Sequence, residues 1–140
     1  MGRINWNRVL LGGLLAGVVL NVFDYVLFGV VLAEDLNAAL AALNRPAMDM
    51  SKIWIFVLLD LAFGIFLIWL YAAIRPRFGP GPRTAVIAGL AFWVLIGVLH
   101  ALSEAPMDLM PARIMIISLA VGLVSAPLAA VAGAKIYQEA

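Results

Sequence analysis

The sequence predicts an all-α membrane protein, a bundle of four transmembrane helices, on three observations. Of the 140 residues 66% are hydrophobic and only 12% are charged, whereas a soluble domain is about half apolar and about a quarter charged. Four apolar stretches reach the roughly 20 residues that a helix needs to cross the hydrocarbon core. They cover residues 9–32, 53–74, 84–102 and 114–136. Because little sequence remains outside them, residues 1–140 are predicted to form a single transmembrane domain.

The distribution of basic residues predicts the orientation of the four spans. Cytoplasmic loops of membrane proteins carry an excess of Lys and Arg. Six basic residues lie on the side of the two termini and three on the opposite side, which predicts that both termini are cytoplasmic. The two groups are Arg3, Arg8, Arg75, Arg77, Arg83 and Lys135, against Arg45, Lys52 and Arg113.

The loops connect the spans into two helical hairpins. In the first outer loop Leu36, Leu40 and Leu43 recur at helical spacing before Arg45 and Pro46 interrupt the pattern, which predicts a short interfacial helix. The inner loop, residues 75–83, contains three prolines and two glycines. Since these residues remove backbone donors and favour turns, the whole inner loop is predicted to be non-helical.

A weak internal duplication relates the two hairpins. Residues 46–53 resemble residues 106–114, and each passage leads into the second span of its hairpin. Both halves begin on the predicted cytoplasmic side. A parallel two-plus-two repeat, with its pseudo-twofold axis along the membrane normal, is therefore predicted.

Polar and small residues share helical faces within the spans. Gly13, Gly17, Asn21 and Asp24 follow one another at spacings of four, four and three residues, which puts a GxxxG contact strip and two polar groups on one face. At 1.5 Å per residue, Asp24 and Asp60 both lie roughly 10 to 12 Å below the outer boundary. The predicted helix-packing glycines are Gly13, Gly17, Gly64, Gly97 and Gly122.

The two intramembrane aspartates support several hypotheses. A charged Asp in mid-span costs about 2.5 to 3.5 kcal/mol on insertion scales, so such a residue is a functional candidate by default. Two carboxylates close together in a low dielectric cannot both stay ionised, so the pair could share a proton or bind a cation. Alternatively, each carboxyl locks the bundle through hydrogen bonds, or docks onto a polar group of a partner. The hypothetical polar site comprises Asn21, Asp24, Asp60, His100 and Ser118.

Metal and cofactor binding have only weak candidates. His100, the single histidine, could be an axial ligand with Gly97 leaving room for a macrocycle, or an interfacial residue that bonds to Glu104 one turn away. Four outer methionines offer soft sulfur that suits Cu(I), although methionine is also an ordinary apolar filler. They are Met48, Met50, Met107 and Met110. With no cysteine in the chain, we expect no bound cofactor.

The composition also excludes several function classes. A net charge of +1 provides no basic surface for nucleic acid. The sequence contains no HExxH motif, no phosphate-binding glycine loop and no Ser-His-Asp set at a plausible depth, so an enzyme is not expected. The expected partners are the lipid bilayer and either other membrane protein subunits or further copies of the chain.

Two short motifs carry a resemblance to a known group of proteins. Ile4-Asn5-Trp6 near the start, and Arg75-Pro76-Arg77-Phe78-Gly79-Pro80-Gly81-Pro82 in the inner loop, resemble an uncharacterised family of small bacterial four-span inner-membrane proteins. The resemblance implies a bacterial inner membrane and no activity. Because almost no sequence lies outside the spans, helix packing is the main interaction surface, and the leading interpretation is a non-enzymatic accessory or scaffold subunit of a larger membrane complex. The alternatives are a small oligomeric proton, cation or small-solute transporter that uses Asp24 and Asp60, and a cofactor- or copper-binding subunit.

Overall fold

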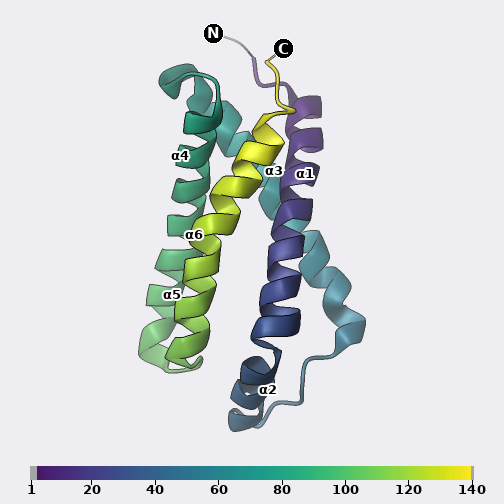
Figure 1. Ribbon diagram of the computed structural model, residues 1–140, viewed down its shortest axis with the longest axis vertical. Coiled ribbons are helices and arrows are strands. Elements are labelled where there is room, and N and C mark those ends of the chain that lie inside the picture. Colours follow the sequence, from purple (N-terminus) through teal and green to yellow (C-terminus); the bar gives the residue numbers. More distant parts are fainter. Residues whose placement is uncertain (1–2, 140) are drawn as a thin grey trace.

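The computed structural model describes residues 3–139 and confirms the predicted four-helix fold. Four helical rods run antiparallel between two ends of the molecule (Figure 1), and each is long and apolar enough to cross a membrane. The described residues contain no strand. The first rod is α1 (Trp6–Val26) with the π-helical η1 (Leu27–Val31), and the second is the 3₁₀ turn η2 (Met50–Lys52) with α3 (Ile53–Phe78). The third rod is α4 (Pro82–Phe92) with the π-helical η3 (Trp93–Val98), α5 (Leu99–Glu104) and the 3₁₀ turn η4 (Ala105–Met107). The fourth rod is α6 (Ala112–Ala134).

Both described ends of the chain lie at one end of the bundle (Figure 1). We call this the termini end, which comprises residues 3–8, 75–83 and 131–139. The opposite end, with residues 33–52 and 105–111, is called the loop end. The first rod begins at Trp6, three residues earlier than predicted, because the Asn5 side chain caps it by accepting a hydrogen bond from the Arg8 N–H at 3.2 Å.

The tightest helix contact is a seam of glycines between α1 and α3. A Cβ atom on Gly64 would overlap the backbone of both Gly13 and Gly17, and one on Gly17 would lie 2.6 Å from the Cα atom of Leu61. Only glycine permits such a close approach of two backbones. The amide of Asn21 extends the seam by donating to the carbonyl oxygens of Gly17 (3.1 Å) and Val57 (3.3 Å).

The helix α6 lies between α1 and α4 and contacts both (Figure 1). A Cβ atom on Gly12 of α1 would lie 2.6 Å from the carbonyl oxygen of Gly133. On the other side of α6, a Cβ atom on Gly89 of α4 would lie 2.7 Å from the nitrogen of Pro127. The bundle is therefore closed by backbone contacts on both faces of α6.

The main core lies in the half of the bundle near the termini end. The half near the loop end is more open, since every residue from 53 to 59 at the start of α3 is exposed. The buried core residues are Val9, Ala16, Leu20, Leu67, Ile68, Tyr71, Ala72, Ala85, Ala88, Phe92, Ala126, Ala129, Ala130 and Tyr137.

The prediction of a non-helical inner loop is wrong for residues 75–78 and 82–83, which belong to α3 and α4. Helix α3 continues through Pro76 to Phe78, and only residues 79–81 separate it from α4. The Thr84 hydroxyl donates to the Gly79 carbonyl at 2.6 Å, and the Tyr71 hydroxyl accepts from the Gly81 N–H at 3.1 Å. Both glycines have positive φ values, 86° and 117°, which glycine adopts readily. Tertiary contacts thus compress the turn to three residues.

A short helix occupies the first loop, as predicted. It is α2 (Ala33–Ala42), and its Ala39 packs in a second buried cluster with Leu27, Leu32 and Ile114. An ion pair between Asp35 and Arg113, at 3.2 Å, also ties α2 to the start of α6. Beyond α2, hydrogen bonds from Ser51 lower the pKa of the exposed Asp49 carboxyl.

Candidate functional site

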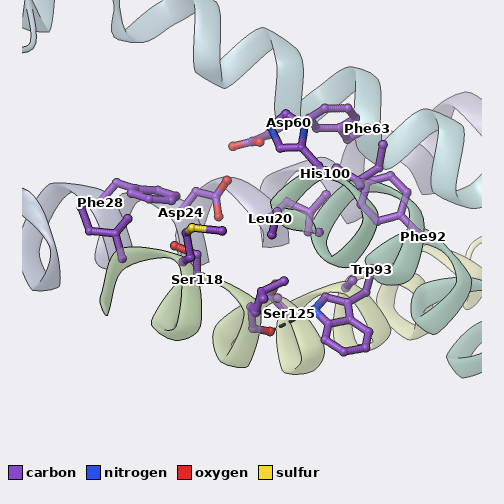
Figure 2. A pocket seen from close by; sticks show the side chains of 18 of the residues that line it. Leu20, Asp24, Phe28, Asp60, Phe63, Phe92, Trp93, His100, Ser118 and Ser125 are labelled. Atoms are coloured by element: carbon purple, nitrogen blue, oxygen red, sulfur yellow. Dashed lines mark hydrogen bonds between the residues drawn. The ribbon is translucent and has the colours of Figure 1, made fainter. Parts of the chain in front are cut away.

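A cavity of about 350 Å³ lies in the membrane-spanning part of the molecule, toward the loop end. All four helical rods contribute to its wall (Figure 2). It contains four of the five residues of the predicted polar site. Its polar lining residues are Asp24, Asp60, His100, Glu104, Ser118 and Ser125.

The aspartates Asp24 of α1 and Asp60 of α3 meet in this cavity (Figure 2). Their carboxyl groups point toward each other (Figure 2). Asp60 is only 7% exposed, and Asp24 is half-buried. Two carboxylates held close together in a low dielectric cannot both stay ionised, so this arrangement favours one shared proton.

Helix geometry explains why these two carboxyl groups converge. At the glycine seam Gly17 faces Leu61 and Asn21 reaches Val57, so Asp24 lies nearer the loop end than Asp60 does. Every Cα–Cβ bond in an α-helix tilts toward the helix N-terminus. Since α1 and α3 run in opposite directions, the side chain of Asp24 leans toward the termini end and that of Asp60 toward the loop end. The two carboxyl groups therefore approach each other along the bundle axis.

The third rod contributes a second pair of titratable groups. The Nε2 atom of His100 lies 3.4 Å from a carboxylate oxygen of Glu104, one helical turn away. The side chain of His100 is 66% exposed and that of Glu104 is 37% exposed, whereas Asp60 is buried. Because both residues lie in α5, near the loop end, they form the accessible side of the cavity.

Helix α6 contributes two serines to the cavity wall (Figure 2). The Oγ atom of Ser118 is buried and has no hydrogen-bond partner. Ser125, two turns further along the helix, is 5% exposed. An unsatisfied buried hydroxyl costs about 1 to 3 kcal/mol. Ser118 therefore presents a free donor and acceptor next to the carboxyl pair.

Aromatic side chains form much of the remaining wall, and the predicted polar site included none of them. They are Phe28, Phe63, Phe92 and Trp93. Phe28 follows Asp24 by four residues and Phe63 follows Asp60 by three, so helical spacing alone places each ring on the face of its aspartate. The rings of Phe63 and Phe92 meet edge to face with centroids 5.7 Å apart. The indole nitrogen of Trp93 donates to the Leu119 carbonyl oxygen of α6 at 2.9 Å (Figure 2).

Two π-helical segments flank the cavity and were not predicted either. Phe28 lies in η1 of the first rod, and Trp93 and Gly97 lie in η3 of the third rod. A π-helical turn contains an extra residue, which rotates the side chains that follow, and such turns are frequent at functional sites. The segment η1 ends the first rod, whereas η3 lies in the middle of the third rod. The two segments therefore do not test the predicted two-plus-two repeat, which stays a prediction.

The remaining predicted residues are Asn21 of the polar site and the five helix-packing glycines. Asn21 lies in the α1–α3 seam and not in the cavity wall, together with Gly13, Gly17 and Gly64. Gly97 and Gly122 both face the Trp93 indole. A Cβ atom on Gly97 would lie 3.3 Å from Trp93 and 3.4 Å from Leu119. The space beside Gly97 that a macrocycle next to His100 would require is therefore filled.

The four outer methionines do not line one common wall. Met110 lines the cavity and packs on the second buried cluster, whereas Met48, Met50 and Met107 are exposed. Among residues 3–139, no three His, Cys, Asp or Glu side chains lie close enough to hold a metal ion.

Comparison with known proteins gives no assignment. The chain matches no protein-family model, no curated protein and no solved structure. The fold nevertheless defines the general class, because four apolar helices of membrane-spanning length are those of a multi-pass integral membrane protein.

Proposed function

We propose that this protein is a proton-binding transporter of the bacterial inner membrane, in which the Asp24–Asp60 pair carries the proton. One observation carries the proposal, namely that two carboxyl groups from different helices face each other inside a cavity within the membrane. Ionisable residues within membrane spans are rare, and they mark ion pathways and proton relays. The sequence raised transport as an alternative, and the cavity now favours it over the accessory role.

The charges around the cavity support proton binding. The lining contains four titratable side chains, those of Asp24, Asp60, His100 and Glu104, and no Lys or Arg. A basic partner would hold the carboxylates permanently ionised as ion pairs. Without one, the pair can gain and lose a proton, and the exposed His100 and Glu104 provide exchange partners on the side of the loop end.

The distribution of basic residues supports the direction of access. The positive-inside rule assigns the termini end to the cytoplasm and the loop end to the outer side. The cavity lies toward the loop end and therefore takes up protons from the outer side. Transport requires a second conformation that exposes the same pair toward the cytoplasm, as in alternating access.

Proton flux into liposomes tests this proposal. The purified protein is reconstituted with a pH-sensitive dye inside, and a potassium diffusion potential, negative inside, drives proton uptake. We expect uptake above that of protein-free liposomes, and its loss in the double variant Asp24→Asn with Asp60→Asn.

The matched control for this experiment is Asp49→Asn. Asp49 is an exposed aspartate outside the cavity, so its substitution should leave proton uptake at the wild-type rate. Equal uptake by the wild type and the double variant would contradict the proposal, as would wild-type uptake no greater than that of empty liposomes.

A second candidate function, an accessory or self-associating subunit, has one supporting observation. Residues 53–59 of α3 are exposed around the whole helix, so this segment has free surface for a neighbouring helix. The strip formed by Gly13, Gly17 and Gly64, by contrast, is used within the chain. Native mass determination after mild-detergent purification tests this role. Stoichiometric recovery with another membrane protein, or as a homo-oligomer, would support it, and a monomeric chain would contradict it.

A further inference from the structure

The cavity combines negative charge with aromatic rings. The rings of Phe28, Phe63, Phe92 and Trp93 line the same cavity as the carboxyl pair (Figure 2). Aromatic faces carry partial negative charge and attract cations, above all quaternary ammonium groups, whose methyl groups pack on the rings. The volume of about 350 Å³ lies at the lower end of the roughly 300 to 1,000 Å³ that small-molecule sites occupy.

Among the described residues, no Lys or Arg side chain lines the cavity. Asp60 is 7% exposed, and its carboxyl faces the carboxyl of Asp24 (Figure 2). The buried Oγ atom of Ser118 is also without a partner. These groups therefore offer acceptors for a positively charged ligand that comes from outside the chain.

The cavity has an exposed rim toward the loop end. The side chain of its lining residue His100 is 66% exposed, and the start of α3 and the rod that contains α5 both carry exposed apolar residues, such as Leu58 and Leu95. A lipophilic ligand dissolved in the outer leaflet can approach between them. A small inorganic cation fits less well, because such ions prefer several oxygen ligands and much of this wall is aromatic and aliphatic.

We propose that the cavity binds a small lipophilic organic cation, an amine or quaternary ammonium compound, in exchange for the proton of the Asp24–Asp60 pair. This inference rests on the proposed exchangeable proton. The O–H bond of the protonated carboxyl breaks, and the proton leaves toward water on the side of His100 and Glu104. The cation then lies between two carboxylates and the rings. One positive charge replaces another, so the net charge of the pair and its ligand stays at −1.

Calorimetric titration of the purified protein with benzyltrimethylammonium tests the exchange. This probe is permanently charged and cannot release a proton itself, so any released proton comes from the protein. Titration in two buffers with different ionisation enthalpies gives the number of protons released. We expect saturable binding with about one proton released per bound cation, as the exchange requires.

Three variants locate the binding site. Removal of one carboxylate in Asp60→Asn should weaken binding on the order of a hundredfold or more. Phe63→Leu keeps the apolar bulk but removes the ring, and should weaken binding about threefold to thirtyfold. Phe56→Leu, the same change at a 50% exposed position of the same helix, should bind like the wild type.

The outcomes separate this inference from the proposed function. Proton flux without cation binding, or binding that Asp60→Asn leaves unchanged, would overturn the inference and leave the transporter proposal standing. Cation binding that depends on Asp60 would overturn the transporter proposal and leave the inference standing if the protein shows no proton flux, either alone or with benzyltrimethylammonium enclosed in the liposomes. Equal losses in Phe63→Leu and Phe56→Leu would contradict the aromatic site.

Discussion

At the scale of single residues, the important feature is how few partners the intramembrane polar groups have. The carboxyl groups of Asp24 and Asp60 face each other (Figure 2), and the Oγ atom of Ser118 has no partner among the described residues. In hydrocarbon, water cannot satisfy such groups. A protein that needed only stability would gain by replacing them with apolar residues, so their presence agrees with a binding role.

Replacement of Ser118 tests this interpretation. Because its hydroxyl is buried and unpaired, Ser118→Ala should leave the free energy of unfolding unchanged or raise it by up to about 1 kcal/mol. The same variant should weaken cation binding if the hydroxyl contacts the ligand. Thermal unfolding in detergent and the calorimetric titration measure the two effects, and a clear loss of stability would show that Ser118 is structural.

Trp93→Phe tests the opposite case, a partly buried polar group that has a hydrogen-bond partner. The indole nitrogen of Trp93 donates to the Leu119 carbonyl oxygen of the neighbouring helix α6 at 2.9 Å. Loss of an interhelical hydrogen bond in a membrane protein costs about 0.6 kcal/mol on average, with a maximum near 1.7 kcal/mol. Thermal unfolding should therefore show a small decrease in stability, opposite in sign to that of Ser118→Ala. An unchanged midpoint would contradict a structural role for this bond.

At the scale of helices, the α1–α3 seam sets the position of the carboxyl pair. Gly64→Ala would insert a Cβ atom into the backbone of Gly13 and Gly17, and rigid backbone cannot move aside as a flexible side chain can. Overpacking of this kind costs typically about 1 to 3 kcal/mol. We expect a lower thermal midpoint together with reduced proton uptake, because separation of α1 from α3 also separates Asp24 from Asp60.

Gly29→Ala is the matched control for the seam. A Cβ atom at Gly29 would lie 3.5 Å from the ring of Tyr25, which is ordinary van der Waals contact. This variant should unfold like the wild type. Similar destabilisation by both substitutions would show that the loss reflects glycine in general and not the close approach of α1 and α3.

These helices show which features of the structure could be predicted from the sequence alone. Apolar stretches of sufficient length predicted all four rods, and their periodicity put Asp24, Asp60, His100 and Ser118 on faces that meet in one cavity. Helical spacing could also have placed Phe28 and Phe63. The π-helical segments could not be predicted, because they arise from tertiary packing and leave no periodic signal. The helix through Pro76 was missed for a related reason, since local propensity does not include the contacts of Tyr71 and Thr84 with the following turn.

At the scale of the whole molecule, the termini end is the more tightly packed half and the loop end the more open one. The ring of Tyr137 lies under the guanidinium group of Arg75, 5.5 Å from its centroid, and meets Tyr71 edge to face at 5.8 Å. Arg75 also approaches Glu139 at 3.4 Å. These contacts hold the C-terminal segment against α3, whereas the cavity occupies the looser half.

The orientation of the whole bundle is directly testable because the chain contains no cysteine. Single cysteines introduced by Ser51→Cys at the loop end and by Ser103→Cys in the adjacent last turn of α5 should react with a membrane-impermeant maleimide in intact bacterial cells. Gln138→Cys at the termini end should react only after permeabilisation. All three positions are exposed, so burial does not confound the comparison. The reverse labelling pattern would place the cavity on the cytoplasmic side.

The central claim is that Asp24 and Asp60 share a proton within the membrane, and infrared spectroscopy tests it most directly. A protonated carboxylic acid has a C=O stretching band distinct from that of a carboxylate. At neutral pH the wild type and Asp49→Asn should both show this band, and the double variant Asp24→Asn with Asp60→Asn should lack it while retaining its helical circular dichroism. A wild-type protein without the band, or a double variant that keeps it, would contradict the account.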